Sequence, residues 1–159
     1  MSGGHCGHAD RPAPATGLAG KFSFQYTAAV ALLDGAVTVA SFSDARRFAP
    51  DVVALLPRIV LAPDAARQGR FDAMHLAVEV TWPGGKAHGE CDGPPGIWGK
   101  PVPEALLRAK ATDCLATALG SGTAADIIGE VDRFETFDRT AFAQLMAALA
   151  RPAHGAQTS

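Results

Sequence analysis

The sequence predicts an α+β fold, in which a small antiparallel sheet with packed helices is followed by a helical tail. Residues 74–81 alternate between apolar and polar side chains, which is the pattern of a half-buried strand. A Pro-Gly-Gly turn and a second extended segment follow, as in a β-hairpin. Helical periodicity dominates the rest of the chain. Because a hairpin and not a helical crossover joins the strands, we expect an antiparallel sheet.

Length and composition exclude several classes of protein. The chain has 159 residues, 48% of them hydrophobic and 19% charged, with a net charge of −2. This length suits one ordinary domain, or one compact domain with an appendage, and the absence of a basic stripe argues against a nucleic-acid partner. No apolar run approaches the length of a membrane span, and the N-terminus lacks the apolar region of a secretion signal, so we expect no membrane partner.

The three cysteines, Cys6, Cys91 and Cys114, are an odd number without CxxC spacing. Free thiols of this kind favour a reducing cytoplasm over a disulfide framework. We expect Cys91 and Cys114 to be partly buried and inert. Residues 1–16 and 151–159 lack periodicity and are expected to be a flexible arm and a flexible C-terminus. The stretch His5-Cys6-Gly7-His8 has no second ligand pair, so no metal site is expected.

The first helix is predicted from Phe22 or Ser23 to Gly35. Ser23 suits the N-cap position, and Gly35 suits the residue after the last turn. The helix is apolar around most of its circumference and should therefore be buried. Its beginning is polar, with Lys21, Gln25 and Tyr26 close together in the sequence.

Residues 37–61 are predicted to form short helical and extended segments. Residues Val37 to Ala40 are expected to be extended, and Ser43 to begin a helical turn that continues through Arg47. Pro50 suits the first turn of a helix over Asp51 to Leu56, with Val52, Val53, Leu55 and Leu56 facing inward. Residues Arg58 to Leu61 are predicted to be strand-like.

The hairpin is the clearest β prediction. Its first strand should place Met74, Leu76, Val78 and Val80 on one face and His75, Ala77, Glu79 and Thr81 on the other. Residues Lys86 to Asp92 form the returning arm, a weakly apolar edge strand.

The tail begins after a rigid loop over Gly93 to Pro101. Pro103 and Glu104 open a helix with Leu106, Leu107, Ala111 and Leu115 along one side. Two further amphipathic helices are predicted over about residues 123–132 and 140–150. We therefore expect an α/β domain over residues 17–101 and a helical tail over residues 102–150.

Motifs that would identify an enzyme directly are missing. The sequence has no GxGxxG after a strand, no P-loop and no GxSxG, and no cofactor is expected. His75 and His88 lie on the two arms of the hairpin and could face each other as a catalytic pair or simply be surface residues. Glu79 and Glu90 suit the solvent face of the sheet.

Several stretches resemble the MmgE/PrpD family, which includes 2-methylcitrate dehydratase, cis-aconitate decarboxylase and iminodisuccinate epimerase. These stretches are TGLAGKFSFQYTAAVALLDG, VTVASFSD with APDVVALLPRIVL, GIWGKPVPEALLRAKATDCL and DRTAFAQLMAAL. The third is similar to a Gly-Pro-Pro loop of the family, here Gly99 to Pro103, followed by a helix that contains Lys110. The resemblance runs from about Pro14 to Leu149.

The resemblance implies a lid-like domain over residues 17–101 and returning helices over residues 102–150. It also implies that a large all-helical domain, which carries the family's principal catalytic residues, is not included. The tyrosine of SFQY, Tyr26, resembles a lid tyrosine that lines the active-site cleft, and Lys21 could attract a di- or tricarboxylate. Lys21, Gln25 and Tyr26 would then face a cleft. The alternative for Tyr26 is a core aromatic with a satisfied hydroxyl, and for Lys21 a solvated cation.

Three functional hypotheses follow. The chain is the C-terminal part of a 2-methylcitrate dehydratase-like lyase, active only with a separate N-terminal helical chain, as a split-gene fragment would be. Alternatively, it is a non-enzymatic remnant or a self-associating module, with a homo-oligomer expected in either case. A small independent enzyme using Tyr26, His75 or His88 is a third reading. Dehydration, decarboxylation and epimerisation all occur in the family, so the resemblance leaves the reaction open.

Overall fold

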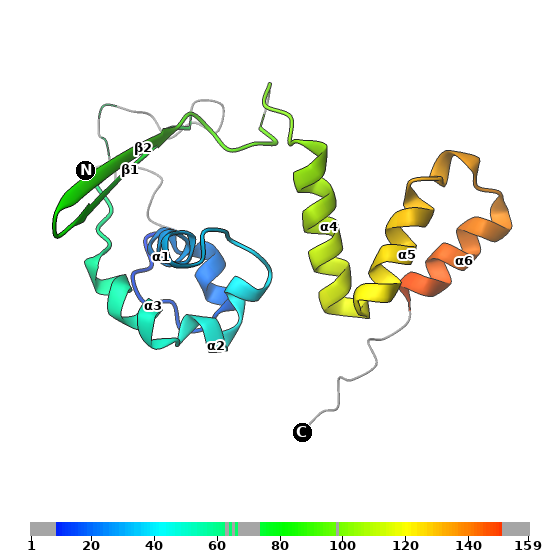
Figure 1. Cartoon of the computed structure of the whole chain (residues 1–159), viewed down its shortest axis with the longest axis horizontal. Helices are drawn as coiled ribbons and strands as arrows, with labels where there is room; N and C mark the ends of the chain where they lie inside the picture. Colours follow the sequence, from blue (N-terminus) through cyan, green and yellow to red (C-terminus); the bar gives the residue numbers. More distant parts are fainter. Residues whose placement is uncertain (1–8, 63, 65, 67–73, 98, 151–159) are drawn as a thin grey trace. The chain divides into compact units, whose positions relative to one another are not determined.

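The computed structural model describes residues 9–62, 64, 66, 74–97 and 99–150. The chain divides into two compact units, residues 1–102 and 103–159, which are described separately below. The described residues form six α-helices, short 3-10 turns and a two-stranded antiparallel sheet (Figure 1). The predicted α+β class is confirmed.

Helix α1 (Phe24–Asp34) is the centre of the first unit and follows a 3-10 turn, η2 (Leu18–Phe22). The hydroxyl of Ser23 caps it by accepting a hydrogen bond from the Tyr26 N–H at 3.0 Å. Gly35 ends it with φ at 74°, a left-handed conformation that glycine adopts without strain. Both helix-end predictions are confirmed, because each depends only on local backbone chemistry.

Four short elements follow and curve around α1, which Figure 1 shows along its axis. They are η3 (Ala40–Phe42), α2 (Asp44–Arg47), α3 (Pro50–Leu55) and η4 (Leu56–Arg58). Ser43 caps α2 by accepting a hydrogen bond from the Arg46 N–H, and a proline opens α3. The predicted helical turn and the predicted helix are thus present.

Two extended segments that the sequence predicted are absent. Residues 37–40 lead into η3, where the Thr38 N–H donates to the Ser41 hydroxyl at 3.0 Å. Arg58 ends η4, and residues 59–61 follow it without forming a strand. Both segments are rich in β-branched residues, but a strand needs a neighbour to pair with, and the only ladder among the described residues joins β1 to β2.

The core of the first unit is small. The buried apolar residues are Tyr26, Ala29, Val30, Val52 and Leu56, with Phe42, Leu55 and Ile59 partly buried against them. Val53, predicted to face inward, is 48% exposed. The other three residues predicted to face inward, Val52, Leu55 and Leu56, do lie in or against the core.

Residues 9–17, here called the N-terminal strap, lie along the beginning of α1. The Phe24 N–H donates to the Ala9 carbonyl at 3.0 Å, and the Ser23 hydroxyl donates to the Arg11 carbonyl at 2.6 Å. Residues 9–16 belong to the segment expected to be a flexible arm, and these contacts fix them on the helix. Residues 1–8 of that segment lie outside the described residues.

The strap also reaches α2. The Arg47 Nε donates to the Pro14 carbonyl at 2.8 Å, and the Gly17 N–H donates to the Asp44 carboxylate at 2.7 Å. Arg47 is only 7% exposed, so this hydrogen bond satisfies a buried cation. The strap therefore contacts both the start of α1 and helix α2.

The hairpin consists of β1 (Leu76–Trp82) and β2 (Gly85–Cys91), joined by a tight turn in which Gly84 has φ at 99°. The register pairs large residues of β1 with small residues of β2: Leu76 with Cys91, Val78 with Gly89, Val80 with Ala87 and Trp82 with Gly85. The predicted hairpin and its apolar face are confirmed. Leu76, Val78 and Trp82 remain 38–54% exposed on that face.

The second unit contains α4 (Glu104–Leu119), α5 (Ser121–Val131), the 3-10 turn η6 (Phe134–Thr136) and α6 (Arg139–Leu149). All three predicted helices are present. Asp138 caps α6 by accepting a hydrogen bond from the Ala141 N–H at 2.8 Å. Among the described residues, no helix combines the length and apolar character needed to cross a membrane.

Candidate functional site

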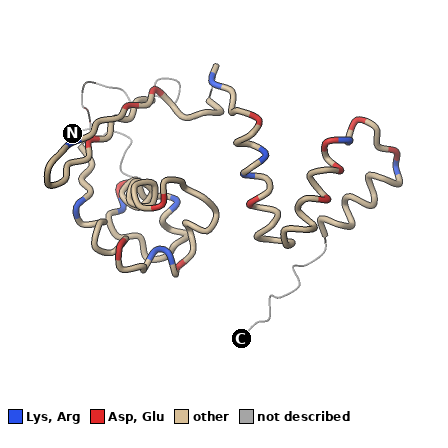
Figure 2. The backbone as a smooth tube through the Cα atoms, viewed as in Figure 1, with Lys and Arg blue, Asp and Glu red and all other residues tan. Residues whose placement is uncertain are grey.

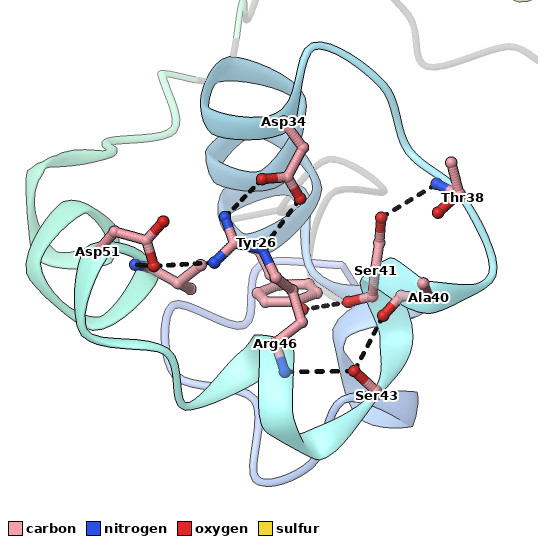
Figure 3. A network of polar contacts seen from close by, with 9 residues as sticks. Tyr26, Asp34, Thr38, Ala40, Ser41, Ser43, Arg46 and Asp51 are labelled. Carbon is pink, nitrogen blue, oxygen red and sulfur yellow. Dashed lines mark hydrogen bonds and ion pairs between the residues drawn. The ribbon is translucent and has the colours of Figure 1, made fainter.

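Tyr26 lies in the centre of the first unit with no exposed surface (Figure 3). Its ring is tilted against that of Phe42, with 6.3 Å between the centroids. Its hydroxyl donates a hydrogen bond to the Ser41 carbonyl. Burial raises the pKa of this phenol above 10, against the lowering effect of the Arg46 and Arg47 charges. At neutral pH the group is therefore a proton donor and not a base.

The ring of Tyr26 lies directly against Gly20. A Cβ atom at Gly20 would come within 2.4 Å of Tyr26 Cδ1. No other residue type lets η2 approach the ring so closely. The glycine that precedes Lys21 in the sequence is thus part of the tyrosine's environment.

Arg46 forms a charged clamp next to this core (Figure 3). Its guanidinium donates to both carboxylate oxygens of Asp34, at 2.9 and 2.6 Å, and to Asp51 at 2.8 Å. Hydrogen bonding to Arg46 lowers the pKa of Asp51, and the two carboxylates raise the pKa of Arg46. The clamp joins the end of α1 to the start of α3 through α2. Sequence reasoning missed it, although Ser43 already placed Arg46 in a capped helical turn.

Lys21 is exposed, and its Nζ lies 5.4 Å from the centroid of the Phe42 ring. Phe42 therefore contacts both predicted site residues, Lys21 and Tyr26. A cation over an aromatic face is weakly attracted to it and keeps most of its hydration at an exposed position. The ammonium group remains available to an anion from solvent.

Gln25 has a different environment from its neighbour Tyr26. It is 3% exposed, and its Nε2 donates to the Asp10 carboxylate of the strap at 2.6 Å. Its Oε1 is buried and has no hydrogen-bond partner. The expectation that Lys21, Gln25 and Tyr26 share one cleft-facing surface is not met in this structure, because Gln25 and Tyr26 are both covered, each by its own partner.

The two histidines of the hairpin do not face each other as a catalytic pair. The register places His88 opposite Glu79, and its Nε2 contacts Glu90 at 2.8 Å. His75 Nδ1 contacts Asp92 at 2.6 Å. Each imidazole thus has its own carboxylate, because the position opposite His88 is four residues along β1 from His75. Glu79 and Glu90 are exposed, as predicted.

The cysteine prediction is also wrong in part. Cys91 and Cys114 are free thiols, as expected, but both are exposed and not partly buried. Cys91 lies on the uncovered face of the hairpin, and α4 has no buried residue at all. Sequence patterns assign an apolar face to each element, but they do not show whether another element covers that face.

No group of three or more metal-ligand side chains occurs within the described parts of the chain. His5, Cys6 and His8 lie outside those parts. Within the described parts of the chain, the positions of Lys and Arg alternate along the backbone with those of Asp and Glu (Figure 2).

The second unit has an apolar groove of about 260 Å³ between α4 and α5. It is lined by Leu107, Ala111, Leu115, Ile127, Ile128 and Val131, with Glu104, Arg108 and Asp132 at its rim. Arg108 contacts Asp132 at 2.8 Å, so the two rim charges satisfy each other. The groove offers packing surface and no reactive group.

Comparison with known proteins identifies the family. The profile of the MmgE/PrpD C-terminal domain matches residues 3–136. This match includes the strap, α1 and the hairpin, and it extends through α5. The chain belongs to the MmgE/PrpD family.

Curated relatives of this MmgE/PrpD domain include two cis-aconitate decarboxylases. The enzyme of Mus musculus is 30% identical over 132 residues, and that of Homo sapiens is 28% identical over 132 residues. Each alignment covers 82% of this chain and 27% of the relative. The chain therefore spans about a quarter of the length of these relatives, and it corresponds to the C-terminal domain of the family.

Proposed function

We propose that this MmgE/PrpD C-terminal domain forms the lid side of a lyase active site for small di- or tricarboxylates, as in 2-methylcitrate dehydratase. The observation that supports this most is the match of residues 3–136 to the family's C-terminal domain. The relatives, whose names describe decarboxylation of a tricarboxylate, support the same substrate class. The domain would be inactive until a helical MmgE/PrpD domain completes the site, either as a separate chain or within the same protein.

In this proposal Lys21 attracts the anionic substrate and Tyr26 donates a proton or a hydrogen bond. Lys21 suits its role because its ammonium group is exposed. Tyr26 suits proton donation because burial keeps the phenol neutral. Its hydroxyl already donates to the Ser41 carbonyl, so catalysis requires the Ser41 segment to move when substrate and the second domain are bound.

Reconstitution tests the proposal. The chain is mixed with a helical MmgE/PrpD domain, and turnover of 2-methylcitrate and cis-aconitate is measured. We expect Tyr26→Phe to lower kcat about 100-fold, the usual contribution of a positioned proton donor. We expect Lys21→Met to raise KM about fivefold with little change in kcat, since it removes one electrostatic contact. Lys110→Met, which alters an exposed lysine of α4, is the matched control and should leave both constants unchanged.

Full turnover by the isolated chain would contradict the requirement for a second domain. An unchanged kcat in a correctly folded Tyr26→Phe complex would remove Tyr26 from the chemistry and leave it a core residue. If no helical family domain restores turnover of either substrate, the lyase proposal fails.

A second candidate is a non-enzymatic, self-associating module, and the uncovered apolar residues favour it. Leu18, Phe22, Phe48 and Val60 are each more than half exposed in the first unit. Apolar surface of this extent is normally covered by a partner or by another copy. Sedimentation velocity of the pure chain should show a homo-oligomer that adding the helical domain dissociates. A monomer at all concentrations, with no binding of an apolar dye, would contradict self-association.

We also propose a cytoplasmic location. The exposed thiols of Cys91 and Cys114 support it, since unpaired surface cysteines suit a reducing compartment. Fractionation of the host cells is the check, and recovery of the protein outside the cytoplasm would refute it.

A further inference from the structure

We propose that the side-chain amide of Gln25 binds a small hydroxycarboxylate, and that the carboxylate of Asp10 occupies the ligand's place in this structure. The inference rests on the proposed function for the substrate class and adds a residue to the same domain's binding surface. In the absence of ligand, the carboxylate of Asp10 forms the hydrogen bond that the ligand would form. The argument concerns the beginning of α1, where the strap crosses it.

The contact between Gln25 and Asp10 already has the chemistry of carboxylate recognition. The amide Nε2 donates to Asp10 Oδ1 at 2.6 Å, within a side chain that is 97% buried. Asp10 itself is exposed and lies on the strap. A carboxylate arriving from solvent could therefore replace that of Asp10 at Nε2 without entering the core around Tyr26. Hydrogen bonds to charged acceptors are stronger than neutral ones, and an incoming carboxylate would form the same kind of bond that Asp10 forms now.

The other half of the amide lacks a partner. Gln25 Oε1 is buried and accepts no hydrogen bond. An unsatisfied buried acceptor is unfavourable, so a donor that reached this oxygen would be bound well. Rotating the amide by 180° does not solve the problem, since it would direct the carbonyl oxygen at the Asp10 carboxylate. A ligand that binds here should therefore carry a hydrogen-bond donor for Gln25 Oε1 in addition to its carboxylate. A hydroxyl group next to the carboxylate is such a donor.

The N-terminus of helix α1 also favours binding of a carboxylate near Gln25. Gln25 belongs to the first turn of α1, an eleven-residue helix, where the backbone dipoles favour negative charge. No acidic residue of α1 lies in that turn, and the negative charge is supplied by Asp10 from outside the helix. A bound carboxylate would take over this interaction as well as the hydrogen bond.

Titration of the full ¹⁵N-labelled chain tests the inference, with the Gln25 side-chain amide followed by NMR. The probes are citrate, which carries a hydroxyl, and tricarballylate, which has the same three carboxylates without it. We expect citrate to shift the Gln25 amide signals and to bind about fivefold more tightly than tricarballylate, the value of one hydrogen bond. The Gln25 signals are identified by their absence in Gln25→Met.

Two variants of Asp10 distinguish two effects on citrate binding: the release of the Gln25 Nε2 donor and the loss of a negative charge that repels the ligand. Asp10→Asn removes the negative charge but keeps an oxygen that accepts from Nε2, whereas Asp10→Ala removes both. We expect Asp10→Ala to bind citrate about fivefold more tightly than Asp10→Asn. Equal affinities of the two variants would show that Asp10 only repels anions, and would overturn its role as a substitute for the ligand.

If citrate leaves the Gln25 amide signals of the wild-type chain unchanged, the binding role of Gln25 is refuted, whether or not the variants fold. Equal affinities for citrate and tricarballylate would refute the hydroxyl contact to Oε1. These outcomes are independent of turnover. An active reconstituted lyase without citrate binding at Gln25 would refute this inference alone, and citrate binding without turnover would refute the proposed function alone.

Discussion

Replacing Tyr26 with alanine is expected to lower the free energy of unfolding of the first unit by about 3–5 kcal/mol, the usual effect of removing a buried aromatic ring. Tyr26 is the largest fully buried side chain among the described residues, and the core cluster around it is small. The measurement is amide hydrogen exchange at Val30, in the middle of α1, which reports on this unit alone. The exchange rate should rise by at least about 100-fold.

Tyr26→Phe separates the ring from the hydroxyl. The phenylalanine keeps the contacts with Phe42 and Gly20 but leaves the Ser41 carbonyl without its donor, so we expect a loss of about 1–3 kcal/mol. Phe22→Ala is the matched control, because Phe22 is 59% exposed, and its effect should stay below about 1 kcal/mol. A change in Tyr26→Ala no larger than in the control would show that this core does not hold the unit together.

Replacing Gly17 with alanine is expected to cost about 2–4 kcal/mol, the second-largest effect. A Cβ atom at Gly17 would come within 2.4 Å of both the Phe42 carbonyl oxygen and the Ser43 carbonyl carbon. These are backbone atoms, which cannot turn aside as a flexible side chain would. The substitution must therefore push the strap away from η3 and weaken the hydrogen bond from the Gly17 N–H to Asp44.

Gly89→Ala is the control for this steric effect. Gly89 lies in β2, and a Cβ atom there would meet nothing within 4 Å. We expect its effect on the free energy of unfolding to stay below about 1 kcal/mol, within the range of strand propensities. The same exchange measurement at Val30 is used for both variants. If Gly17→Ala leaves that rate unchanged, the close contact between the strap and η3 is not required for stability.

The features of this fold that depend on residues close together in the sequence are the ones that could be predicted. The Ser23 cap, the Gly35 terminus, the hairpin with its turn and the three tail helices each follow from residues within a few positions of one another. The apolar face of the hairpin was also predictable, because side chains in a strand alternate with a period of two.

The environment of the candidate site depends on contacts between distant parts of the chain, and no periodicity encodes them. Tyr26 meets the carbonyl of Ser41, and Gln25 meets Asp10 of the strap. Arg46 reaches back to Asp34. The segments Val37 to Ala40 and Arg58 to Leu61 show the same limit, since their β-branched residues favour extended backbone but no strand lies beside them.

The core of the first unit has a consequence for how the protein forms during synthesis. The buried residues of its core cluster lie between Tyr26 and Leu56, and the clamp from Asp34 to Asp51 lies within the same interval. Contacts between residues close in sequence need little loop closure, so such a core forms fast. It can close on the ribosome as soon as Ile59 has left the exit tunnel, before the hairpin has emerged from that tunnel.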